Sequence, residues 1–287
     1  MRIKIGLAQI YPKLGDVRHN LGVHLDTARR AREDGVDLLI FPELSLTGYQ
    51  VQDLVPEVAL TADADDEVFA QLLEASRELA LDIVVGFVHV DFRKRFYIAN
   101  AYLSGGEARH IHHKLYLPTY AMFDESRYFA QGNSVRAFDT RFGRVGMLIC
   151  EDFWHVSPPY LLWLDGADML ILNSSSPSRG LNEGDRLMGT RWVEHVNQAY
   201  GSMFTSYILH CNRVGYEDGK NFWGGSSVVD PDGEFMTHGL YFDEALITQE
   251  IDLNQLHRTR ARLPLLRDER PGLVRRELGR ILSENLG

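Results

Sequence analysis

Short apolar runs alternate with amphipathic segments along the chain, and this rhythm constrains the fold more than any other feature. The segments with apolar residues at helical spacing are 17–33, 65–80, 158–164 and 184–200. The apolar runs of buried-strand length are 36–41 (VDLLIF), 82–88 (DIVVGFV), 143–150 (GRVGMLIC) and 168–173 (DMLILN). Alternation of this kind predicts a layered α/β domain with sheets inside and helices outside.

Two further strands and two hairpins complete the prediction. Residues 2–9 and 202–209 are strand-like, and residues 96–103 and 107–114 form a hairpin around the Ser104–Gly106 turn. A second hairpin is predicted between residues 225–229 and 246–251, around the turn at 231–233. No low-complexity linker divides the chain, so one domain is expected.

Charge and cysteine content exclude several classes of protein. The net charge of -10 disfavours nucleic acid and anionic membranes as partners, because both would repel an acidic surface. Only Cys150 and Cys211 are present, so a disulfide scaffold is excluded. The N-terminus lacks the apolar core of a signal peptide, and no apolar run approaches the length of a membrane span. We therefore expect a cytoplasmic protein with a free thiol.

Three chargeable side chains end apolar segments. Cys150 ends the run GRVGMLIC, Glu43 follows LLIFP, and Lys114 follows ARHIHH. Each alone is ordinary, since a cysteine is usually a small buried apolar residue and a strand-end carboxylate or lysine usually faces water. Strand ends in α/β folds also open into clefts, so the three together indicate a site.

The combination suits the cleavage of an amide. A thiol attacks best as a thiolate and needs a base, which a carboxylate held out of water can be. The attacked carbonyl becomes an oxyanion, which a lysine ammonium and the backbone N–H after the nucleophile can stabilise.

Three segments resemble the signatures of the nitrilase (carbon–nitrogen hydrolase) superfamily. They are FPELSLTGY around Glu43, HKLYLPTY around Lys114 and GMLICEDFW around Cys150, in the family's order and separation. Supporting segments are FDESRYFAQG from Phe123, CNRVG from Cys211 and GGSSVVDPDGE from Gly224. The resemblance covers almost the whole chain.

The resemblance implies a four-layer αββα sandwich and roles for individual residues. Glu43 is expected to be the general base, Lys114 to stabilise the tetrahedral intermediate, and Cys150 to be the nucleophile, with Glu125 helping to position lysine and substrate. The N–H of Glu151 is expected to complete the oxyanion hole. The residues expected to contact substrate are Tyr49, Tyr120, Phe123 and Glu151. No cofactor and no metal are expected.

Within the superfamily, these sequence segments are most similar to those of the glutaminase domain of glutamine-dependent NAD synthetases. In this chain that domain is expected to stand alone. After Asn173 the chain reads SSSPSRGLNEGDR where those glutaminases have an SPY-type segment, so the amide that it cleaves stays open. The expected substrate is a small amide. N-carbamoyl compounds and nitriles are alternatives that use the same triad.

Two other classes of protein are weighed against this interpretation. The run His110-x-His112-His113 would suit a metal-dependent amidohydrolase, although no further ligand set is visible. A binding protein that has lost activity is disfavoured, because it has no need of all four of Glu43, Lys114, Glu125 and Cys150.

Several further residues have weaker claims. Trp154, Tyr160 and Trp163 could wall a pocket or belong to the core. Arg179 and Arg191 could bind a substrate carboxylate. Cys211 is interpreted as structural.

The C-terminal segment differs from the rest of the chain. Eight arginines crowd residues 256–287, which suits either a solvated helix or an arm that reaches a partner subunit. We take residues 1–255 as the hydrolase domain. The resemblance implies assembly as a homodimer or a higher homo-oligomer.

Overall fold

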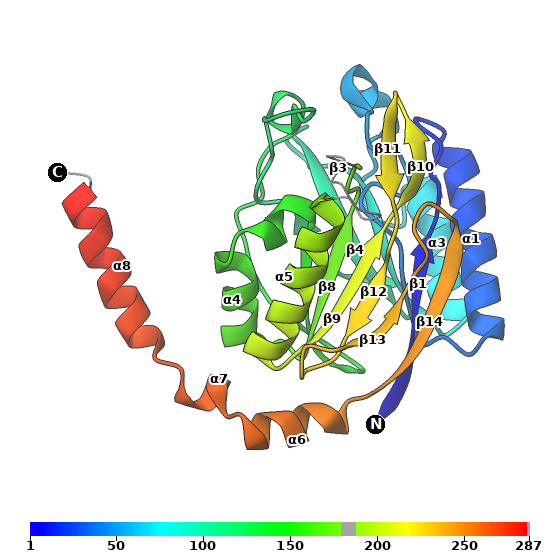
Figure 1. The fold of residues 1–287 in the computed structure, drawn as a ribbon. Coiled ribbons are helices and arrows are strands. Elements are labelled where there is room, and N and C mark those ends of the chain that lie inside the picture. Colours follow the sequence, from blue (N-terminus) through cyan, green and yellow to red (C-terminus); the bar gives the residue numbers. More distant parts are fainter. Residues whose placement is uncertain (179–187, 286–287) are drawn as a thin grey trace.

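Two six-stranded sheets form the centre of the molecule (Figure 1). The computed structural model describes residues 1–178 and 188–285. In sheet order, the first sheet contains β14 (Ala245–Asp252), β1 (Arg2–Gln9), β2 (Leu38–Ile40), β3 (Asp82–Val90), β4 (Phe96–Ser104) and β5 (Glu107–His113). The second contains β13 (Phe235–His238), β12 (Ser227–Val229), β9 (Tyr207–Asn212), β8 (Met169–Ser174), β7 (Gly143–Ile149) and β6 (Phe138–Thr140).

Some of the helices cover the outer faces of the two sheets. The longer helices are α1 (Val17–Glu33), α3 (Glu67–Glu78), α4 (Ser157–Leu164), α5 (Met188–Phe204), α6 (Asn254–Arg262) and α8 (Pro271–Asn285). The shorter elements are η1 (Gln52–Leu54), α2 (Val55–Val58), η2 (Glu125–Arg127), η3 (Cys150–Trp154), α7 (Leu265–Asp268) and the ribbon of β10 (Val214–Glu217) with β11 (Lys220–Trp223).

Three apolar cores separate the layers. Leu72 of α3 packs with Leu39 of the first sheet in one core. Side chains of both sheets, such as Ile5 and Ile171, meet in a second. A third holds Leu172 of the second sheet with residues of α4 and α5. The order helix, sheet, sheet, helix confirms the predicted αββα sandwich.

The topology brings the ends of several strands to one edge. β2 is parallel to β1 and β3, and β7 and β9 are both parallel to β8. β5 is antiparallel to β4, which is antiparallel to β3, so β5 runs in the direction of β3. Because carboxyl ends of parallel strands share an edge, Glu43, Lys114 and Cys150 leave their sheets on the same side.

The second predicted hairpin was wrong. β12 pairs with β13 around the 231–233 turn, whereas β14 crosses to the first sheet and pairs with β1 over eight residues, from Arg2↔Asp252 to Gln9↔Ala245. That ladder is longer than the one β13 offers, and β14 brings Ile247 and Ile251 to the core between the sheets. Residues 202–204 were also misassigned to a strand, since α5 continues to Phe204.

The C-terminal segment leaves the body of the molecule gradually. Leu256 and Thr259 of α6 are buried, and Arg260 pairs with Asp168 at 2.6 Å. α8 then lies away from both sheets (Figure 1). Among the described residues, no helix combines the length and apolar character that a membrane span requires.

Candidate active site

Cys150 occupies a sharp turn at the end of β7. The strand stops at Ile149, and the chain enters the short helix η3 with Cys150 at a φ of 47°. A non-glycine residue pays about 1 kcal/mol or more for this left-handed conformation, so the surrounding structure must hold it there. Cys150 is 6% exposed and lines a pocket.

Glu43 lies on the loop directly after β2 and is fully buried. Its Oε1 accepts a hydrogen bond from Lys114 Nζ at 2.7 Å, and its Oε2 accepts one from the N–H of Ser175 at 2.7 Å. The loop lies directly on Gly86 of β3, where a Cβ would come within 2.4 Å of the Pro42 carbonyl oxygen. Glycine at this position therefore lets the Glu43 loop pack against the sheet.

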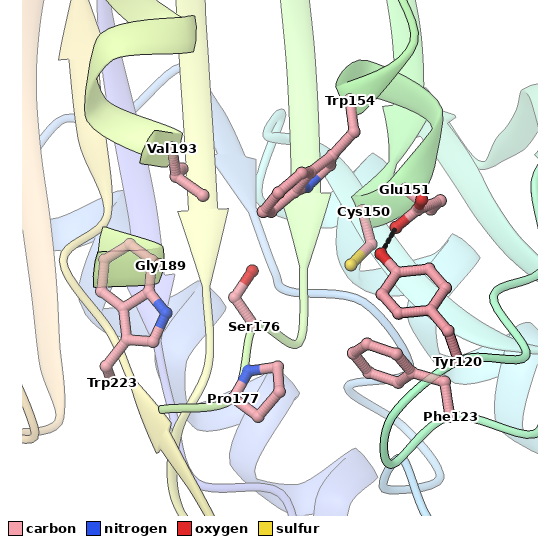
Figure 2. A pocket seen from close by; sticks show the side chains of 10 residues that line it. All are labelled: Tyr120, Phe123, Cys150, Glu151, Trp154, Ser176, Pro177, Gly189, Val193 and Trp223. Carbon is pink, nitrogen blue, oxygen red and sulfur yellow. Dashed lines mark hydrogen bonds between the residues drawn. The ribbon is translucent and has the colours of Figure 1, made fainter. Parts of the chain in front are cut away.

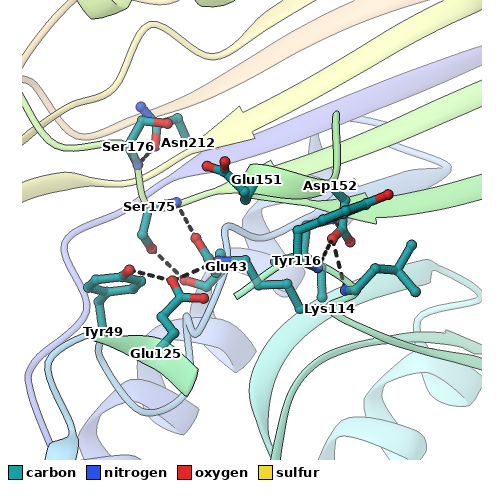
Figure 3. A network of polar contacts seen from close by, with 12 residues as sticks. Glu43, Tyr49, Lys114, Tyr116, Glu125, Glu151, Asp152, Ser175, Ser176 and Asn212 are labelled. Carbon is teal, nitrogen blue, oxygen red and sulfur yellow. Dashed lines mark hydrogen bonds and ion pairs between the residues drawn. The ribbon is translucent and has the colours of Figure 1, made fainter. Parts of the chain in front are cut away.

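Lys114 joins two carboxylates. The residue follows β5, is fully buried, and its Nζ donates to Glu43 Oε1 and to Glu125 Oε1, each at 2.7 Å (Figure 3). An ammonium has three N–H donors, so one is left for a further acceptor.

Glu125 is held from its other side by Tyr49. The Tyr49 hydroxyl donates to Glu125 Oε1 at 2.5 Å, while Glu125 Oε2 is buried without a partner among the described residues. Tyr49 itself is fixed through its N–H, which donates to Glu217 Oε1 at 2.8 Å. Tyr49 was predicted to contact substrate, and the structure places its hydroxyl against Glu125.

Burial and charge set the protonation of the cluster. Burial raises the pKa of Cys150 well above its usual value, the charges of Glu43 and Glu125 add to the shift, and Lys114 opposes it. Burial alone would lower the pKa of Lys114, but Glu125 and Glu43 raise it well above the ordinary lysine value. Burial raises the pKa of Glu125 to about 7, against the effect of Lys114. These shifts leave the Cys150 thiol protonated and the Lys114 ammonium charged.

A small pocket opens at Cys150 (Figure 2). Figure 2 shows the sulfur beside Tyr120 and Glu151, with Trp223 on the far side of Ser176. Three of the four residues predicted to contact substrate line it, namely Tyr120, Phe123 and Glu151. The other described lining residues are Trp154, Ser176, Pro177, Gly189, Val193 and Trp223.

Polar contacts fix Glu151 in this wall. Its Oε2 accepts a hydrogen bond from the Tyr120 hydroxyl at 2.9 Å, and its side chain is 14% exposed. Among the described lining residues, Glu151 has the only charged side chain.

The sequence did not predict the lining residues Ser176, Pro177, Gly189, Val193 and Trp223, nor two residues that hold the catalytic groups. Ser175 follows β8 and bonds Glu43 twice, through its N–H and through its hydroxyl, which donates to the Glu43 carbonyl oxygen at 2.9 Å. Asp152 is fully buried two residues after Cys150. The sequence signal that could have identified Ser175 is a polar residue directly after an apolar run. That signal does not say which residue the side chain contacts.

The histidine run has no common centre. His110 stacks on Phe138, the His112 ring lies against Asp152, and His113 Nε2 lies 2.8 Å from His89 Nδ1. Within residues 1–178 and 188–285, no three side chains of metal-binding type are grouped to hold an ion.

The weaker candidates among the described residues lie in the pocket, in a core or on the surface. Trp154 lines the pocket, whereas Trp163 is buried in the core beneath α4, with Tyr160 partly buried against the same core. Arg191 is exposed on α5, and Arg179 lies outside the described residues. Cys211 is fully buried between the two sheets.

Comparison with known proteins shows similarity over almost the whole chain. A family model described as carbon–nitrogen hydrolase matches residues 4–261. The glutamine-dependent NAD(+) synthetase of Thermotoga maritima is 35% identical over 259 residues, which cover 88% of this chain and 43% of that protein. A probable nitrilase of Schizosaccharomyces pombe is 24% identical, with 97% of this chain and 99% of that protein covered.

A solved structure shows the same architecture. The carbon–nitrogen hydrolase of Helicobacter pylori superposes with a TM-score of 0.86 at 20% identity, covering 97% of this chain and 99% of that one. The chain spans less than half the length of the first NAD synthetases that it matches, from 43% to 46% of each.

Proposed function

The chain belongs to the carbon–nitrogen hydrolase family, and from that premise we propose that it hydrolyses a small amide through a thioester on Cys150. The observation that supports this most is the buried cluster of Glu43, Lys114 and Glu125 beside a pocket that contains the Cys150 thiol.

In the proposed reaction, the thiol proton passes to Glu43 as the sulfur attacks the amide carbonyl carbon. A base is required because burial keeps the pKa of Cys150 high. The third N–H of Lys114 and the N–H of Glu151 stabilise the oxyanion. Glu43 then returns its proton to the nitrogen, the carbon–nitrogen bond breaks, and ammonia or an amine leaves.

The second half of the reaction regenerates the thiol. Water attacks the thioester carbon, Glu43 takes a proton from that water, and the sulfur leaves and recovers the proton. The products are a carboxylic acid and the free enzyme. Glu125 Oε2, which is buried and has no partner among the described residues, is available to accept a hydrogen bond from the amide nitrogen.

The described pocket walls favour a small acyl group that carries a hydrogen-bond donor. Phe123, Trp154 and Trp223 provide aromatic surface, which suits a compact apolar body. Glu151 provides a carboxylate, and the buried Ser176 hydroxyl has no partner among the described residues. A substrate with an ammonium or amide N–H near its carbonyl would satisfy both acceptors, and ω-amides such as glutamine belong to this class.

Variants at the two cysteines test the proposal. Primary amides, ω-amides, N-carbamoyl compounds and nitriles are screened with wild type, Cys150→Ala and Cys211→Ala. We expect an amide to be turned over by wild type and Cys211→Ala and to be untouched by Cys150→Ala. Activity that survives in Cys150→Ala at a similar rate contradicts the proposal.

The same screen separates the alternatives. A preference for N-carbamoyl compounds or nitriles would change the proposed substrate but not the proposed roles of Glu43, Lys114 and Cys150. Activity lost to a chelator and insensitive to thiol alkylation would indicate the metal-dependent class. An inactive binding protein predicts no turnover and equally slow alkylation of Cys150 and Cys211.

The C-terminal segment provides a surface for assembly as a homodimer or higher homo-oligomer. Apolar side chains of α8 are between 38% and 53% exposed, namely Leu273, Val274, Leu278, Ile281 and Leu282. Burying such a stripe against a second copy of the chain would remove apolar area from water. Light scattering of the full chain and of a variant with serine at Leu278 and Ile281 tests this, since the variant is expected to dissociate. An unchanged mass contradicts it.

A further inference from the structure

Asp152 has a buried carboxylate that lies within hydrogen-bond distance of four donor groups. Its Oδ1 accepts from the N–H groups of Leu115 and Tyr116, at 2.8 Å and 3.0 Å (Figure 3). Its Oδ2 accepts from the N–H of Ile149 at 3.1 Å and lies 2.9 Å from His112 Nε2. A carboxylate only accepts, so the histidine Nε2 carries the proton.

These donors flank the two groups that carry the proposed chemistry. Leu115 directly follows Lys114, and His112 precedes it by two residues. Ile149 directly precedes Cys150. Asp152 contacts neither reacting group through its carboxylate, yet it holds the backbone just after the lysine, the His112 ring just before it, and the backbone N–H of the residue before the nucleophile.

The two segments come from different sheets. β5, which precedes Lys114, is the edge strand of the first sheet, and β7 belongs to the second. The distance between ammonium and sulfur therefore depends on how the sheets are held at this edge. Cys150 also sits on a turn with a positive φ, which needs support from its surroundings.

We propose that Asp152 is a positioning residue that fixes Lys114 relative to Cys150 across the junction of the two sheets. The proposal rests on the proposed function, because it assigns Asp152 its effect through those two groups. A misplacement of about 1 Å in such a geometry can cost about 100-fold in rate.

Asp152→Asn tests this with little change of shape. The amide offers one oxygen and one NH₂, so either the Leu115 and Tyr116 donors or the Ile149 donor must face another donor. We expect kcat to fall about 100-fold, with KM changed much less, because the pocket walls stay in place. Alkylation of Cys150 should also shift to higher pH, since the thiolate loses a well-placed ammonium.

Asp82→Asn is the matched control. Asp82 is also buried and multiply bonded, accepting from the Tyr102 hydroxyl at 2.7 Å and the Ser104 hydroxyl at 2.8 Å, at the start of β3 away from the site. It should lose comparable stability while keeping the wild-type kcat and the wild-type pH profile of Cys150 alkylation.

Failure of this proposal is distinct from failure of the proposed function. If Cys150→Ala is inactive but Asp152→Asn matches Asp82→Asn in kcat and in its alkylation profile, Asp152 is structural only and the positioning role is refuted. If Cys150→Ala keeps its activity, the proposed function itself fails. If Asp152→Asn does not fold, His112→Gln removes the ring that faces Oδ2, and an unchanged alkylation profile there also refutes the proposal.

Discussion

The buried cluster around Lys114 and the arginine-rich C-terminal segment are both rich in charge, yet they differ in almost every physical respect. In the cluster, Lys114 bridges Glu43 and Glu125 with all three residues at most 5% exposed. In the C-terminal segment, Arg280 bridges Glu277 and Glu284 with side chains at least 50% exposed. The same kind of three-residue ion pair thus occurs in two environments.

The environment decides what such charges do. Water screens the exposed pairs, so they contribute little to stability. The buried charges have lost their hydration, so removing one leaves its partners uncompensated and costs about 3–5 kcal/mol. Charge content in a sequence therefore does not identify a site, whereas charge placed at the ends of buried strands does.

The largest effect is expected for Lys114→Ala. Turnover should fall about 1,000-fold, because the oxyanion loses its cation and the thiol loses the charge that opposes its high pKa. The variant should still fold, with a native circular dichroism spectrum. Steady-state rates of Lys114→Ala are compared with those of Arg280→Ala. Similar rates in the two variants would contradict the functional difference between the buried cluster and the C-terminal segment.

The next largest effect is expected in the pH dependence of stability, through the Glu125 carboxyl. Burial raises the pKa of its carboxyl from 4.5 to about 7 in the folded protein, so folding takes up a proton. This contribution to stability is complete below pH 4.5 and is lost as the pH rises through 7, a change of about 3 kcal/mol. Glu125→Gln should remove it. Urea unfolding at several pH values between 4.5 and 7 measures the difference, and parallel stability curves would contradict the prediction.

A smaller effect is expected for Tyr49→Phe. The variant loses the hydroxyl that donates to Glu125 Oε1, and kcat should fall about tenfold as Glu125 and Lys114 are held less firmly. Tyr102→Phe is the control, because its hydroxyl donates to Asp82 at 2.7 Å away from the pocket. Equal rates for Tyr49→Phe and Tyr102→Phe would remove Tyr49 from the site.

The smallest effect is expected for Arg280→Ala. Its two carboxylate partners stay solvated, so the midpoint of thermal unfolding and the turnover should both stay at their wild-type values. Thermal unfolding and steady-state rates test both statements. A clear loss of stability would mean that Arg280 and its two carboxylate partners are not solvated, which would contradict the prediction.

Much of the architecture could be predicted because strand periodicity and strand ends carry direct physical information. The run VDLLIF is a buried strand whatever its neighbours, and Glu43 must follow it at the sheet edge. The same holds for Cys150 after β7. Since β2 and β7 each run parallel to a neighbouring strand of their own sheet, their carboxyl ends lie at an edge of that sheet whatever the loops are.

Pairing between distant segments could not be predicted in the same way. The sequence pattern identifies 246–251 as a strand but does not identify its neighbour. This strand was therefore assigned to the nearer partner, whereas in the structure, as β14, it pairs with β1. The role of Asp152 could not be predicted either, because its four donors come from segments up to 40 residues away. The contact of Tyr49 with Glu125 depends on two loops that the sequence leaves open.

The central claim is that Cys150 carries the acyl group, and mass spectrometry of the acid-quenched enzyme tests it most directly. Wild-type protein is mixed with a pool of small amides, quenched within the first turnovers, and digested. The proposed reaction predicts a mass increase on the peptide that contains Cys150, equal to the acyl group less one hydrogen, and none on the peptide that contains Cys211. Amide turnover without any adduct on Cys150 would contradict it.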